Sequence, residues 1–180
     1  ISGNYAAKKY GVAIQKRTYD ENGRIADRTF FDKNEQPTYG LQTKCHKVSH
    51  EYDDNGNVIS EVCYNSKGEL SLNDLGCALT KVLWNKNGNM VEGRCLDQDY
   101  KLAQMYSIRV AKYNFTYDAF GHLNSFSFYG IDGKPTFNNE GFAKAVIKND
   151  SKGNKVEVKF FGVDGDLTPG KDGAAINKYI

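Results

Sequence analysis

Glycine recurs along this chain at an almost fixed interval. Gly23, Gly56, Gly88, Gly121 and Gly153 follow one another at steps of 33, 32, 33 and 32 residues. Four of the five close a short segment that opens with Tyr or Trp followed by Asp or Asn, and the fifth opens with Asn-Asp. A period of this length is the signature of a repeat architecture, in which stacked copies of one small unit share a linear core.

The residues within one unit predict β-hairpins. Asp or Asn opens a turn through its side-chain acceptor, and a glycine two or three residues later takes the left-handed conformation that closes a bulged hairpin. The strand before Gly121 alternates, with Tyr113, Phe115 and Tyr117 on one face and Asn114 and Thr116 on the other. We therefore predict an all-β fold, an elongated tandem-repeat array of antiparallel β-hairpins. No linker divides it into two domains.

Further glycines divide the chain into units. Three units have a second glycine twelve residues after the turn glycine, at Gly68, Gly133 and Gly165. The same units have a third glycine eight residues later, at Gly76, Gly141 and Gly173. The first and third units have Glu35 and Tyr100 at the position of the second glycine, and Thr43 and Ile108 at the position of the third. The predicted units are 11–43, 44–76, 77–108, 109–141 and 142–173. Residues 1–10 then resemble the tail of a preceding unit and 174–180 the start of another, so we expect a piece of a longer array.

The four cysteines occupy two matched positions of the unit. Cys45 and Cys77 lie eleven residues before their turn glycines, and Cys63 and Cys95 lie seven after. The other units carry bulky apolar pairs at both positions: Val12 with Phe30, Val110 with Phe128, and Phe142 with Phe160. This joint switching indicates that the two positions touch across the hairpin.

The favoured disulfides are Cys45–Cys63 and Cys77–Cys95, because a bulge could bring each pair within bonding distance. Two alternatives remain: a Cys63–Cys77 bond between units, and buried free thiols. Bonded cysteines would place the protein in an oxidising space, that is, secreted, at the cell surface or in a periplasm.

Residue patterns for metal binding and catalysis are weak. Cys45 lies close to His46 and His50, but the cysteine and the histidines are not expected to converge, and no C-x-x-C spacing occurs. The Asp and Asn residues of 53–57 and 164–166 fit turn chemistry better than a calcium loop. We expect no metal and no cofactor.

Acids recur four residues after some turn glycines, at Asp27, Glu92 and Glu157, but Ser60 and Ser125 take that place in the intervening units. Neighbouring acids are therefore two units apart, which is wrong for a glycosidase pair. We expect no enzyme and no catalytic residue.

One aromatic residue precedes most turns, and these form a column of candidate binding residues: Tyr19, Tyr52, Trp84 and Tyr117. Two interpretations stay open. The rings could face outward as a ladder that stacks on a glycan or an extended peptide, or they could form the core between repeats.

Charge and hydropathy exclude some partners. The net charge is only +2, with both signs mixed along the strands, whereas a nucleic-acid-binding protein has a clustered basic face. The lysines between 144 and 159 are typical of a solvated hairpin face. No stretch is long and apolar enough to cross a bilayer. We expect neither nucleic-acid binding nor membrane insertion.

The Tyr-Asp-x-x-Gly turn, followed by an aromatic pair and a second turn such as Ile131-Asp132-Gly133-Lys134-Pro135, resembles bacterial tandem β-hairpin repeats. The similar families are the tyrosine-aspartate repeats of Rhs-type wall and toxin proteins and the MORN and WG repeats, although the period here is longer than in the Rhs type. The resemblance implies a bacterial envelope or secreted protein whose array is a scaffold or a binding surface. It implies no catalytic residue.

The leading functional hypothesis is a non-enzymatic interaction module that binds a protein or a glycan along one face of the array. The alternative is a structural spacer that presents another domain of a longer polypeptide, and a carbohydrate-active enzyme is a minor third. Unpaired strand edges also predict end-to-end association between chains.

Overall fold

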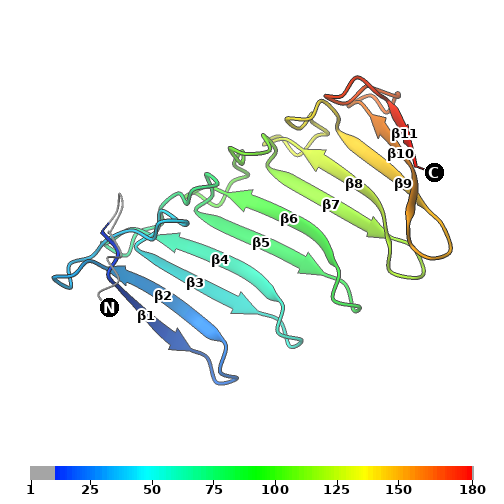
Figure 1. Cartoon of the computed structure of the whole chain (residues 1–180). Coiled ribbons are helices and arrows are strands. Elements are labelled where there is room, and N and C mark those ends of the chain that lie inside the picture. Colours follow the sequence, from blue (N-terminus) through cyan, green and yellow to red (C-terminus); the bar gives the residue numbers. More distant parts are fainter. Residues whose placement is uncertain (1–10, 180) are drawn as a thin grey trace, which may run out of the picture.

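The computed structural model describes residues 11–179, and the expected tail at 1–10 lies outside them. In this part of the chain, eleven strands form one antiparallel sheet, and they lie side by side in the order of the sequence (Figure 1). The strands are β1 (Ile14–Tyr19), β2 (Ile25–Phe31), β3 (Lys47–Tyr52), β4 (Val58–Tyr64), β5 (Leu79–Trp84), β6 (Met90–Leu96), β7 (Lys112–Tyr117), β8 (Leu123–Tyr129), β9 (Lys144–Asn149), β10 (Lys155–Phe161) and β11 (Ile176–Lys178). The predicted all-β hairpin array is confirmed.

The recurring glycine turns have the conformation that their Asp or Asn and Gly residues predict. In the second unit, the Asp53 carboxylate accepts hydrogen bonds from the backbone N–H groups of Asn55 at 3.0 Å and Asn57 at 2.8 Å. Gly56 takes a left-handed φ of 84°, and the strand pairing shifts register between Glu51 and Tyr52. The Asp or Asn of the other four units binds its turn in the same way. These turns lie at one end of the strands and the longer loops at the other end (Figure 1).

The alternation of 33 and 32 residues has its origin in the last loop of each unit. That loop closes over four residues in the second unit, where the N–H of Asn73 binds the carbonyl of Cys77, and over five in the first, where Gly40 binds Cys45. In the longer loops the residue with left-handed φ is therefore one position further along the chain. We expected Thr43 and Ile108 to correspond to Gly76, whereas the residues with positive φ are Lys44 and Arg109.

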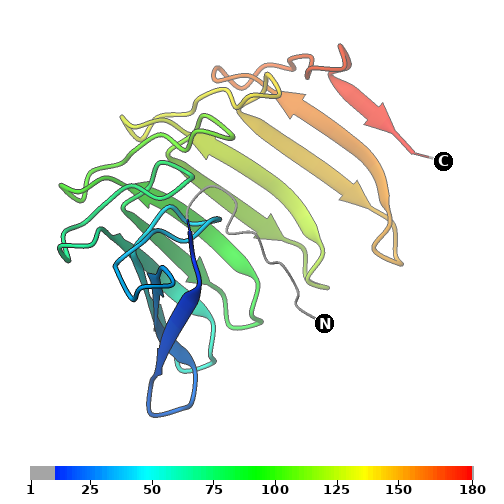
Figure 2. The ribbon, with the colours of Figure 1, turned by 60° about the vertical axis from the view of Figure 1, so that its left-hand side comes forward.

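The sheet has two chemically different faces. The core face carries alternate residues of each strand, including Val48, Cys63, Cys95, Ala145 and Val158, all of which are buried. The lysine face carries the other residues, including Lys16, Lys47, Lys112, Lys144 and Lys159. The sheet bends into an arch, with the longer loops along one rim (Figure 2).

The hydrophobic core is a row of small clusters and not one compact centre. In order along the array, the clusters centre on Val48 with the Cys45–Cys63 pair, on Val110 with the Cys77–Cys95 pair, and on Phe142 with Val158. Among the strands of residues 11–179, contacts run only between neighbours in the chain. Each hairpin therefore depends on the next one for burial, as a repeat array requires.

Candidate binding surface on the core face

The aromatic column ties each unit to the unit before it. The Tyr52 hydroxyl donates to the carbonyl of Ile25 at 2.8 Å, and the Trp84 indole N–H donates to Val58 at 2.8 Å. The Tyr117 hydroxyl binds the carbonyl of Met90 at 2.7 Å, and Asn149 occupies the same place in the fifth unit, bonded to Leu123. Burial raises the pKa of the Tyr117 phenol. These three aromatic residues are half-buried, so the geometry favours the inter-repeat role.

Tyr19 differs from the rest of the column. It is 59% exposed, and among residues 11–179 its hydroxyl has no hydrogen-bond partner. The structure describes no hairpin before β1 to which it could bind.

The structure joins Cys45 to Cys63 and Cys77 to Cys95, with S–S distances of 2.05 and 2.10 Å and Cα separations of 5.4 and 5.2 Å. All four sulfur-bearing residues are at most 2% exposed. The residues at the same two positions of the fifth unit, Phe142 and Phe160, touch with ring centroids 4.6 Å apart. The two matched positions therefore meet across each of these hairpins.

An apolar hollow of about 610 Å³ lies on the core face over the third and fourth units. Its floor includes Tyr113, Phe115, Phe126 and Phe128, and its rim includes the following side chains: Leu75, Met90, Met105, Ile108 and Leu123. Gly93 on β6 lies beneath the Tyr113 ring, and an added side-chain carbon at that position would overlap the ring. Burial raises the pKa of the Tyr113 phenol.

Aromatic contacts connect the hollow to the fifth unit. Phe126 contacts Phe115 and Phe142 at centroid distances of 6.4 and 5.9 Å, and Phe142 continues to Phe160. Every residue of β8 is half-buried, so the Phe126 and Phe128 rings are partly accessible, whereas Phe142 is buried. The aromatic floor of the hollow, which lies in the fourth unit, is therefore continuous with the Phe142–Phe160 pair of the fifth.

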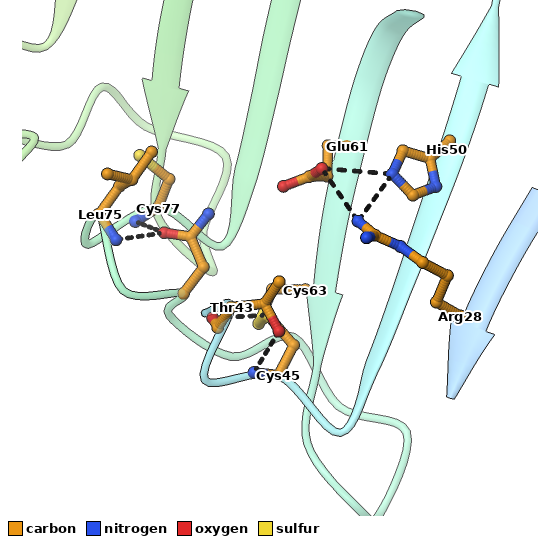
Figure 3. The surroundings of a disulfide bond; sticks show 9 residues. Arg28, Thr43, Cys45, His50, Glu61, Cys63, Leu75 and Cys77 are labelled. Atoms are coloured by element: carbon orange, nitrogen blue, oxygen red, sulfur yellow. Dashed lines mark hydrogen bonds and ion pairs between the residues drawn. A yellow bond between two sulfur atoms is a disulfide. The ribbon is translucent and has the colours of Figure 1, made fainter. Parts of the chain in front are cut away.

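The core face of the first two units is charged instead. Arg28 on β2, His50 on β3 and Glu61 on β4 come together beside the Cys45–Cys63 disulfide (Figure 3). The His50 Nε2 atom lies 3.2 Å from the Glu61 carboxylate and 3.4 Å from Arg28. Hydrogen bonding by His50 holds the pKa of Glu61 below its usual value, against the opposing effect of burial. The other ring nitrogen, Nδ1, is buried and has no partner among the described residues.

The recurring acids lie on the opposite, lysine face, and each has a lysine partner. Asp27 and Glu92 reach a lysine of the next hairpin, with distances of 3.1 Å to Lys47 and 3.4 Å to Lys112, and Glu157 pairs with Lys159 at 3.2 Å. For Asp27, burial raises the pKa, but hydrogen bonds from Ser49, Lys47 and Thr18 outweigh it and leave the pKa lowered. Asp27 and Glu92 therefore cross-link neighbouring strands, whereas Glu157 pairs within β10.

The candidate metal residues are not brought together. The carboxylates of Asp53 and Asp164 accept backbone hydrogen bonds inside their own turns, and His46 contacts the carbonyl of Thr38 at 3.0 Å. Within residues 11–179, no group of three or more His, Cys, Asp or Glu side chains is placed to hold a metal ion. No helix in this part of the chain has the length and apolar character needed to cross a membrane.

Sequence reasoning missed both features of the core face. The alternation of β7 identified Tyr113 and Phe115 as sharing one face, but the loop residues Met105 and Ile108 that rim the hollow gave no such signal. The same alternation in β2, β3 and β4 could have placed Arg28, His50 and Glu61 on one face. Their contact depends on the offset between consecutive hairpins, and no sequence motif predicts that offset.

Comparison with known proteins relates the chain to toxin complexes through its fold. No protein-family model and no curated protein matches the chain. Among solved structures, the crystal structure of TcdB2-TccC3-TEV matches 82% of this chain at 14% identity, with a TM-score of 0.50. The Tc holotoxin pore of Photorhabdus luminescens matches 81% at 12% identity, with a TM-score of 0.41.

This chain covers only 7% and 9% of the respective toxin chains. At these identities the likeness concerns the fold alone. It shows that antiparallel hairpin repeats of this kind occur within a much larger toxin-complex chain.

Proposed function

We propose that the chain is a non-enzymatic scaffold that binds a polypeptide along its core face. The observation that carries the proposal is the apolar hollow over the third and fourth units, whose floor is a strip of half-buried aromatic rings. Contiguous exposed apolar surface on a water-soluble fold marks a site of protein interaction. Apolar side chains of a partner would fill the hollow and remove these rings from water.

The chemistry of the lining favours a polypeptide over a glycan. Ser107 and the Tyr113 hydroxyl are the polar side chains among the residues that line the hollow. A sugar would leave most of its hydroxyls without partners there, and each unpaired buried polar group costs about 1–3 kcal/mol. The aromatic column offers little alternative, because Tyr52, Trp84 and Tyr117 are held against the preceding unit.

The disulfide pairs and the toxin-complex likeness support an extracellular or periplasmic setting for this scaffold, since disulfides persist in oxidising compartments. The recurring acids support a role without catalysis, because Asp27, Glu92 and Glu157 are engaged by lysines. The ties between units also suit a spacer, and a partner bound to the core face is compatible with that second role.

Selection from a displayed library of random twelve-residue peptides tests the proposal. We expect the chain to enrich peptides with two or more large apolar residues, and Phe115→Ala to weaken their binding about tenfold. Leu83→Ala is the matched control, since Leu83 is a 52% exposed apolar side chain outside the hollow. Circular dichroism and the midpoint of thermal unfolding verify that both variants fold. No enrichment, or equal losses in the two variants, would contradict the proposal.

A further inference from the structure

Two arginines face each other on the core face at the start of the array. Arg17 on β1 and Arg28 on β2 are directly paired across the strands, and like charges in this position destabilise a sheet. Within the described part of the chain, Arg28 pairs with one carboxylate, Glu61 at 3.9 Å, which is already engaged by His50. Arg17 donates to the Gln15 side-chain carbonyl at 3.1 Å and makes no ion pair within residues 11–179. The site therefore carries excess positive charge.

Both arginines line a hollow of about 380 Å³ between the first hairpin and the loop that follows it. One part of its wall is apolar, formed by Val12, Phe30 and Leu41, and another is polar, with Gln15 and Gln42 beside the arginines. The Nε atom of Arg28 is buried and has no hydrogen-bond acceptor in the described part of the chain. One cavity is thus lined by an arginine with an unsatisfied buried donor, Arg28, and by an arginine without an ion pair in the described residues, Arg17.

This combination fits a carboxylate on a hydrocarbon stem. The guanidinium group presents a planar fork of donors that matches a carboxylate in a bidentate manner. The apolar wall suits the methylene groups that carry it, and the glutamine amides can donate to a second oxygen. We propose that this arginine hollow binds a carboxylate of a polypeptide. The inference rests on the proposed function in one respect, namely that the ligand of the core face is a polypeptide.

Titration of the full chain with small carboxylates tests the inference without a known partner. Side-chain Nε–Hε signals in NMR spectra of ¹⁵N-labelled protein, assigned through Arg17→Gln and Arg28→Gln, report on each arginine. The probes are N-acetylglutamate α-methylamide for a side-chain carboxylate, N-acetylleucine for a chain end, N-acetylglutamine methylamide as the neutral isostere, and inorganic phosphate.

We expect saturable shifts of the Arg17 and Arg28 signals with at least one carboxylate and none with the neutral isostere. Arg17→Gln should weaken binding about tenfold, as measured on the Arg28 signal, because it removes a charge-assisted contact. Arg94→Gln on the lysine face is the matched control and should leave the affinity unchanged.

Unmoved arginine signals, equal shifts with the neutral isostere, or a response to phosphate alone would overturn the inference. The two proposals fail separately. Carboxylate binding without peptide enrichment refutes the scaffold role of the apolar hollow, whereas enrichment that depends on Phe115 without any carboxylate response refutes the arginine hollow.

Discussion

The second and fifth units place different chemistry at the same two positions. In the second unit Cys45 and Cys63 are bonded, and in the fifth Phe142 and Phe160 stack with centroids 4.6 Å apart. The disulfide is small and closes its own hairpin. The phenylalanine pair is large and also contacts the fourth unit, through Phe126 and Phe128.

The difference shows how one backbone can carry two kinds of surface. A covalent bond stabilises a hairpin through the unfolded state and needs little apolar area. The core face around the Cys45–Cys63 disulfide can therefore hold Arg28, His50 and Glu61. Packing must bury large side chains to achieve a similar stabilisation, so the face around Phe142 is aromatic and continuous with the apolar hollow.

The largest effect is expected from the aromatic side of the comparison. Phe142→Ala should lower the free energy of unfolding by about 3–5 kcal/mol, because it leaves a cavity beneath three rings. Urea unfolding followed by tyrosine and tryptophan fluorescence measures the change. Phe137→Ala, at a 45% exposed ring, is the matched control. If both substitutions cost the same, the aromatic strip does not stabilise the C-terminal units.

Loss of one disulfide should have the next largest effect. The double change Cys45→Ala with Cys63→Ala should cost about 3 kcal/mol in the chain-entropy description of a loop with a separation of 18 residues. Urea unfolding measures the cost. Intact mass after alkylation of the denatured chain is the control: we expect no reactive thiol before reduction and all 4 cysteines alkylated after it.

Four reactive thiols before reduction would contradict the bonded state. A more specific variant replaces the disulfide of the second unit with an apolar pair taken from another unit. Cys45→Val with Cys63→Phe copies the Val110–Phe128 pair of the fourth unit and should recover part of the lost stability without a covalent bond. Failure to exceed the double alanine variant would show that the second unit lacks room for packing.

The hydrogen bonds between units are expected to contribute equally to the free energy of unfolding in the two regions. Tyr52→Phe and Tyr117→Phe each remove one hydrogen bond to the preceding unit and leave a partly buried carbonyl with one partner fewer. Each should cost about 1 kcal/mol in thermal or urea unfolding. Tyr19→Phe is the control with an expected cost near zero, since that hydroxyl has no partner in the described chain. A clear difference between Tyr52 and Tyr117 would mean that the units are not coupled alike.

Turns that lack glycine offer a stabilising change. Glu35 and Tyr100 adopt left-handed φ values of 60° and 62° at the position held by Gly68 in the second unit. Glu35→Gly and Tyr100→Gly should each raise the free energy of unfolding by about 0.5–1 kcal/mol, because a side chain in this conformation is strained. Gly68→Ala is the converse control and should destabilise. A loss of stability on introducing glycine would show that these side chains make compensating contacts.

The smallest effect concerns acid. Hydrogen bonding by His50 lowers the folded-state pKa of Glu61, so its contribution to stability is present above the unfolded pKa and is lost as pH falls through the folded value. Glu61→Gln should therefore flatten the loss of stability below about pH 4.3. Thermal unfolding between pH 3 and 6 measures it, with the exposed Glu51→Gln as control. An unchanged pH profile for Glu61→Gln would exclude the carboxylate as a local stabiliser.

Features that depend on one hairpin were predictable, and features that depend on the offset between hairpins were not. The turn glycines bring the positions of Cys45 and Cys63 close together on one hairpin, and their joint exchange for apolar pairs in other units indicated that they touch. The aromatic column is visible in the sequence as one ring before most turns, but its hydrogen bonds to Ile25, Val58 and Met90 depend on the position of the preceding hairpin. The residue that absorbs the longer step, Lys44 instead of Thr43, was also missed, because the extra residue could be accommodated at either position.

The disulfides have a mechanical consequence. Cys45–Cys63 encloses the β3–β4 hairpin and Cys77–Cys95 encloses β5–β6. If the chain is pulled from its two ends, the first, fourth and fifth hairpins can extend fully, whereas each enclosed segment withholds about 60 Å of contour length. Under such a force the second and third units would each keep a closed loop, and reduction would lengthen the extended chain by two fixed steps.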